Sequence, residues 1–137
     1  MYDNILVPVA FDEGSDEKIA KAVAVARRLA AQNARITLIH VMEQVPGYAI
    51  NYMPADYSAQ ARKAIEGELH DLAAEIPGGV GLVVEGHSGR TILDWAEANR
   101  SDLIVIASHR PGMQDLLIGS TAAQVVRHAT CAVHVLR

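Results

Sequence analysis

The sequence predicts one parallel α/β domain, with a five-stranded doubly wound sheet that carries helices on both faces. Two observations lead to this prediction. Short apolar segments rich in branched residues alternate with amphipathic helical segments, and no linker or internal repeat interrupts them. The chain length of 137 residues also suits a single compact domain that spans residues 1–137.

Five apolar segments are the expected strands. Each is short and lacks the polar alternation of a half-buried strand, so each is expected to be covered on both faces. They span residues 5–9, 36–41, 80–84, 103–107 and 132–136. The element order is therefore βαβαβαβαβ, which is typical of a Rossmann-like sheet.

Four helical segments connect these strands. The first begins at Ser15, with acidic residues in its first turn, and continues to about residue 30. The others span residues 59–76, 91–99 and 120–127. By contrast, residues 44–56 have no clear period and contain glycine and proline. They predict a long loop that either covers a ligand or packs on a partner subunit.

Composition limits the class of protein. Half of the residues are apolar, 20% are charged and the net charge is −4, which predicts a globular domain with no nucleic-acid partner. No apolar run approaches the ~20 residues of a membrane span, so no membrane partner is expected. Cys131 is the single cysteine, and no secretory leader is visible at the start, so a reducing, cytoplasmic location is expected.

The expected ligand site lies beyond the carboxyl ends of the strands, where such sheets bind ligands. Three loops qualify, following Val9, Val41 and Ala107. Gly119, Ser120 and Thr121 open the last helix, and a helix N-terminus with free N–H groups favours a phosphate. The alternative is that one of the two hydroxyls only caps that helix.

Four separated segments resemble the universal stress protein family in order and spacing. They are residues 4–9, 102–109, 116–120 and 125–133, and the Ser-His-Arg-Pro sequence at 108–111 is similar to a small bacterial single-domain branch. The resemblance implies an adenine nucleotide alpha hydrolase-like sheet that acts in stress response or signalling. It also implies a bound nucleotide, ATP or else ADP or AMP, with or without Mg²⁺.

The resemblance also implies the residues of the nucleotide site. Val41 corresponds to a position where the family's backbone contacts adenine, and Ala10 is included only as a lining position. His109 is in addition a candidate acid, base or phosphate contact, whereas His40 is expected to be structural. The implied site comprises Pro8, Val9, Ala10, Val41, Ala107, His109, Arg110, Gly119, Ser120 and Thr121.

Two features depart from the family pattern Gly-x2-Gly-x9-Gly-(Ser/Thr). Ala107 and Arg110 occupy the two leading glycine positions, which restricts how closely the backbone approaches a phosphate, although Arg110 can offset this through its charge. Ala10 stands where the family usually has an aspartate near the metal-linked phosphates. Asp12, two residues later, either replaces that aspartate or is a turn residue.

Catalysis is left open by the sequence, which indicates slow ATP hydrolysis or autophosphorylation at most. Gly119 and Ser120 lack the preceding Gly-x4-Gly-Lys of a Walker loop. The family typically dimerises through its last strand, so the resemblance implies a homodimer paired through Ala132–Leu136, with a signalling partner that the sequence does not identify. The alternative is a dimeric interaction protein of the same fold that has lost ATP binding.

Overall fold

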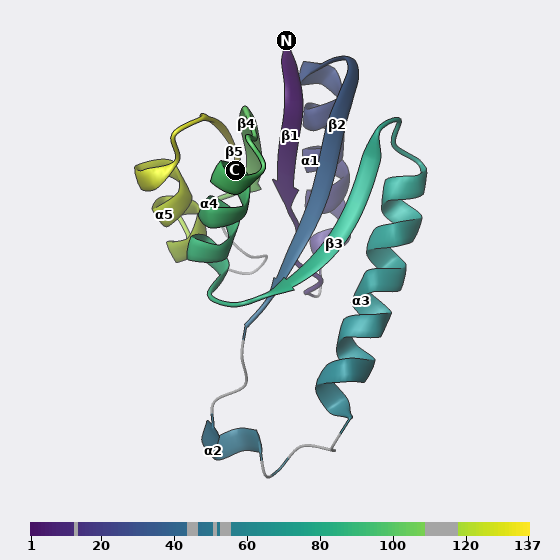
Figure 1. Ribbon diagram of the computed structural model, residues 1–137, viewed down its shortest axis with the longest axis vertical. Coiled ribbons are helices and arrows are strands. Elements are labelled where there is room, and N and C mark those ends of the chain that lie inside the picture. The colour runs from purple at the N-terminus through teal and green to yellow at the C-terminus, as the bar shows by residue number, and fades with distance from the viewer. Residues whose placement is uncertain (13, 44–46, 51, 53–55, 109–117) are drawn as a thin grey trace.

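The computed structural model describes residues 1–12, 14–43, 47–50, 52, 56–108 and 118–137. Within them the chain forms a five-stranded parallel sheet of order β3-β2-β1-β4-β5, with helices on both faces (Figure 1). The predicted fold class is therefore confirmed. The strands are β1 (Tyr2–Pro8), β2 (Ala30–Met42), β3 (Gly79–Glu85), β4 (Leu103–Ala107) and β5 (Ala132–Leu136). The helices are α1 (Ser15–Leu29), α2 (Gly47–Ile50), α3 (Tyr57–Ala74), α4 (Ser88–Ala98) and α5 (Ser120–His128).

The core has two halves, one on each face of the sheet. Side chains of successive strand residues point to opposite faces, so Ile5 and Val7 pack under α1 and α3 while Leu6 packs under α4 and α5. All three are fully buried. This double burial explains why the central strands are continuous apolar runs, as the sequence indicated.

The last helix and strand are less deeply buried than the centre of the sheet. Cys131, between α5 and β5, packs against the half-core beneath α4 and α5. Its partial burial raises the pKa of its thiol above the ordinary value. Cys131 therefore behaves as a small packing residue.

Two elements differ most from the prediction. β2 begins at Ala30, directly after α1, because Ala30 and Arg35 pair with β1 on either side of a register shift. The segment predicted as a loop over residues 44–56 contains the short helix α2, since four residues are too few to show a helical period. In Figure 1, α2 lies apart from the sheet, and its Tyr48 is 81% exposed.

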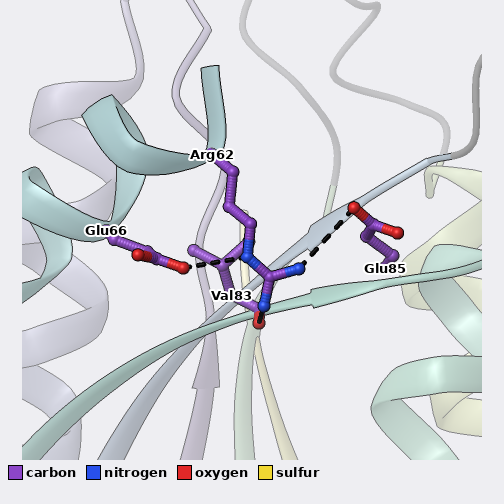
Figure 2. Close-up of polar contacts among 4 residues, drawn as sticks. All are labelled: Arg62, Glu66, Val83 and Glu85. Atoms are coloured by element: carbon purple, nitrogen blue, oxygen red, sulfur yellow. Dashed lines mark hydrogen bonds and ion pairs between the residues drawn. The ribbon is translucent and has the colours of Figure 1, made fainter. Parts of the chain in front are cut away.

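The two edge strands, β3 and β5, differ in the contacts that they make. Beside β3, Arg62 of α3 donates hydrogen bonds to Glu66 at 2.9 Å and to the Val83 carbonyl at 3.1 Å (Figure 2). Arg62 also lies 3.6 Å from a carboxylate oxygen of Glu85. This contact joins α3 to the end of the edge strand. At the opposite edge, β5 pairs only with β4 among the described residues.

The strand order places the topological switch point between β1 and β4. From β1 the chain winds outward to β2 and β3, then crosses back to β4 and continues to β5 on the other side. Loops that leave β1 and β4 therefore diverge, which opens a crevice at their carboxyl ends. Among the helices in the described ranges, none has the length and apolar character needed to cross a bilayer.

Candidate functional site

A cavity of about 480 Å³ lies at the carboxyl ends of β1, β2 and β4. It occupies the switch-point crevice that the topology opens. Every described residue of the predicted site lines this cavity, whereas His109 and Arg110 lie outside the described residues. The predicted residues that the structure brings together are Pro8, Val9, Ala10, Val41, Ala107, Gly119, Ser120 and Thr121.

The first turn of α5 forms one wall of the cavity. Gly119 is the N-cap, with φ −65° and ψ 159°, and no side-chain oxygen caps the helix. The alternative that Ser120 or Thr121 serves only as a cap is therefore not what the structure shows. The Gly119 N–H donates to the Ser108 carbonyl at 2.5 Å, and the Ser108 N–H donates to the Leu136 carbonyl at 2.6 Å. These bonds fix the helix start against the ends of β4 and β5.

Three helices begin at this cavity, with Ser15 of α1, Ser88 of α4 and Ser120 of α5 on its lining. The first N–H groups of a helix have no partner within the helix, and the helix dipole is positive at this end. Lys18, in the first turns of α1, adds a cationic side chain to the same lining. The electrostatic character of this part of the cavity favours an anionic group such as a phosphate.

His40 was expected to be structural, but it also lines the cavity. Its Nδ1 lies 2.8 Å from the Val9 carbonyl oxygen, which can only accept, so Nδ1 carries the proton and donates. Its ring centroid lies 5.4 Å from that of Phe11. His40 therefore joins the ends of β1 and β2 and shapes the cavity floor. The sequence feature that could have indicated this role is its position immediately before Val41, which was itself a predicted site residue.

A chain of three polar side chains closes another side of the cavity. The Ser88 hydroxyl donates to a Glu43 carboxylate oxygen at 3.3 Å and lies 3.0 Å from the Thr121 hydroxyl oxygen. Because Ser88 has one hydroxyl proton and gives it to Glu43, Thr121 is the donor to Ser88. Glu43 and Ser88 were not among the residues predicted from the sequence. The signal for Glu43 was its place directly after the second strand.

The close approach of α4 and α5 makes this chain possible. Gly89, next to Ser88, is buried, and a Cβ at Gly89 would meet the side-chain amide of Gln124 on α5. Any larger residue at position 89 would have to displace the Gln124 side chain, so glycine favours this close packing. The contact brings Ser88 within hydrogen-bonding distance of Thr121.

The described residues do not fit a Mg²⁺ ion held by the protein. Mg²⁺ requires octahedral oxygen ligands and is usually held by one or two carboxylates together with substrate phosphates and waters. In the described part of the lining, Glu43 is the single carboxylate, so the protein alone does not supply the ligand set. Asp12 does not line the cavity: its backbone N–H donates to the Ser15 hydroxyl at 3.1 Å and its carbonyl accepts from the Ser15 N–H at 3.0 Å. The backbone of Asp12 therefore belongs to the turn that starts α1.

The fold and cavity define a doubly wound α/β protein with a cavity at its switch point. The model of the universal stress protein family matches residues 1–137. Universal stress protein G of Salmonella typhimurium is 31% identical over 144 residues that cover 100% of both chains. The chain belongs to the universal stress protein family.

Solved structures agree with this assignment. Universal stress protein UspA from Lactobacillus plantarum superposes with a TM-score of 0.74 and 27% identity, over 99% of this chain and 98% of that one. Two more distant structures share the fold. One is a universal stress protein in complex with cAMP, with a TM-score of 0.69 and 19% identity over 99% and 97% of the two chains. The other is the Archaeoglobus fulgidus protein in complex with dAMP, with a TM-score of 0.65 and 17% identity over 99% and 98%.

Proposed function

We propose that this protein is an adenine-nucleotide-binding module that acts as a homodimer in stress response or signalling. The ligand is ATP, ADP or AMP, bound in the cavity between β1, β2 and β4. The observation that carries the proposal is that residues from three separate strand ends and the α5 N-terminus, chosen from the sequence alone, line one cavity. A cytoplasmic location, with its supply of ATP, accords with this function.

The chemistry of the cavity supports a nucleotide in a defined orientation. Val41 lies at the end of β2, where its backbone can contact a base. The unpartnered N–H groups at the start of α5 favour a phosphate at the opposite end. Family members of this fold have been solved with cAMP and with dAMP, both of which are adenine nucleotides.

The homodimer is proposed to form through β5. This strand is at the sheet edge, and its residues from Val133 to Leu136 are partly exposed. An edge strand offers unpaired N–H and C=O groups, and antiparallel pairing with a second copy satisfies them about a two-fold axis.

The substitution Gly119→Glu tests nucleotide binding. Gly119 has φ −65°, which any residue adopts, so the variant is expected to fold while it places a carboxylate in the cavity mouth. We expect ATP to raise the Tm of the wild-type protein and to leave that of Gly119→Glu unchanged. Gly67→Glu is the matched control, because nothing lies within 4 Å of a Cβ at Gly67; this variant should respond to ATP as the wild type does.

A second function is favoured by two residues in the same cavity. Ala10 and Ala107 line it at positions where ATP-binding family members carry an aspartate and a glycine. A dimeric interaction protein that has lost ATP binding would account for both. It would be supported if purified protein, once denatured, releases no ATP, ADP or AMP and its Tm does not respond to ATP with or without Mg²⁺.

A further inference from the structure

Glu43 is the first residue after β2, and its carboxylate belongs to the cavity wall. The Ser88 hydroxyl holds one carboxylate oxygen at 3.3 Å, and Thr121 holds Ser88 in turn. The three residues come from the ends of β2, α4 and α5, which are brought together by the fold. The backbone role of Val41 and the helix start at Ser120 do not explain a carboxylate at this place.

We infer that Glu43 recognises the ribose of the bound nucleotide by accepting hydrogen bonds from its 2′- and 3′-hydroxyls. This inference rests on the proposed nucleotide function and specifies it further. It assigns the ligand class as ribonucleotides whose ribose hydroxyls are free, in preference to nucleotides that lack them.

The position of Glu43 follows from the order of groups in a nucleotide. The ribose is covalently placed between the base and the phosphate. In the cavity the proposed base contact, Val41, is two residues before Glu43 on the same strand end. The proposed phosphate contact is the first turn of α5, which contains Thr121. The chain from Glu43 through Ser88 to Thr121 therefore borders the stretch of cavity that a ribose would occupy.

The chemistry of the carboxylate suits a diol. An ionised carboxylate only accepts, through about four lone-pair sites on its two oxygens, so the bond from Ser88 leaves capacity for both ribose hydroxyls. In dinucleotide-binding sheets of related topology, an acidic residue about 20 residues after the glycine-rich turn accepts a hydrogen bond from the ribose 2′-hydroxyl. Hydroxyl donors to a charged acceptor form the stronger class of hydrogen bond.

One oxygen of the exposed carboxylate is engaged by Ser88 before the ligand arrives. Ser88 begins α4, and Gly89 beside it lies against the side chain of Gln124 on α5. Because Ser88 gives its proton to Glu43, the network orients the carboxylate. A preorganised acceptor loses less conformational freedom on binding, which increases its selectivity for the group that it contacts.

The test is isothermal titration calorimetry of the full chain with ATP and with 2′,3′-dideoxy-ATP. We expect wild-type protein to bind ATP about tenfold or more tightly than the dideoxy analogue. The Glu43→Ala variant should bind ATP and the dideoxy analogue with about equal affinity, because the substitution weakens the binding of ATP alone. Glu85→Ala is the matched control: Glu85 ends the neighbouring strand β3 opposite Met42 but does not line the cavity, so its preference should equal that of the wild type.

Two results would overturn the inference while leaving the proposed function intact. One is equal binding of ATP and dideoxy-ATP by the wild-type protein, a comparison that does not depend on any variant. The other is a Glu43→Ala variant that weakens both ligands by the same factor. If the wild-type protein binds neither ligand, the proposed function itself fails, and the inference fails with it.

Discussion

Gly78 shows how one residue sets the geometry of a connection. It lies between α3 and β3 with φ 73°, in the left-handed region, and its N-terminal neighbour in the turn is Pro77. A Cβ at this position would meet the carbonyl oxygen of Ala34 on β2. The Gly78 carbonyl also accepts a hydrogen bond from the Ile36 N–H at 3.1 Å, which aligns β3 with β2. Glycine is therefore required here for both conformation and space.

The substitution Gly78→Ala should lower the free energy of unfolding by about 1–3 kcal/mol, because it adds backbone strain and an overpacked contact. Gly67→Ala provides the control on the exposed side of α3, where nothing lies near the added Cβ. That control should raise stability by about 0.5–1 kcal/mol through helix propensity. Urea denaturation measures both values. Equal stability of the two variants would show that Gly78 is not constrained as described.

At the scale of elements, α3 is attached to the sheet in two ways. Its apolar side packs on the face of β2 and β3, with Leu69 fully buried. Near its start, Arg62 reaches the edge strand and donates to the Val83 carbonyl, as Figure 2 shows. Since Arg62 lies in the second turn, it holds the end of α3 nearest to the segment that contains α2.

The variant Arg62→Met should loosen this end of α3 without unfolding the domain. We expect faster amide hydrogen exchange in the first turns of α3 and at the end of β3, and unchanged exchange in the central strand β1. The neighbouring residue Lys63 is exposed, and Lys63→Met should leave all of these exchange rates unchanged. If both variants exchange alike, the contact with Val83 does not hold the helix.

At the scale of the whole molecule, the sequence predicted the bounds of β4 and β5 best. Both strands match their predicted ranges, because short, mainly apolar runs that follow helical segments have few other solutions. The first residues of β2 were missed because Gln32 and Asn33 are exposed and polar, and the pairing of β2 with β1 shifts register between Ala30 and Arg35. Local pattern carries no information on such pairing.

The candidate site was predictable in its backbone and less so in its side chains. Strand ends and helix starts must meet at the switch point, so Val9, Ala107 and Gly119 could be placed from topology. The network of Glu43, Ser88 and Thr121 depends on how closely α4 and α5 pack, which no local pattern gives. For the same reason His40 was assigned to the core alone, although its ring reaches both the Val9 carbonyl and the cavity.

The proposed dimer belongs to this scale as well. Light scattering after size-exclusion chromatography at micromolar concentration should give twice the chain mass of 14.7 kDa. Ala132 is exposed at the start of β5, and Ala132→Lys should shift the protein toward monomer, since a charge on an edge strand opposes pairing. Ala24→Lys, on the exposed side of α1, should remain dimeric. A wild-type protein that is monomeric at micromolar concentration would contradict the proposed dimer.

The central claim is that the cavity between β1, β2 and β4 holds an adenine nucleotide. Titration calorimetry of ATP into nucleotide-free wild-type protein tests it most directly, with Gly119→Glu titrated in parallel. We predict saturable binding at one ATP per chain in the wild-type protein and none in the variant. An absence of heat in the wild-type protein, or binding that Gly119→Glu leaves intact, would contradict the claim.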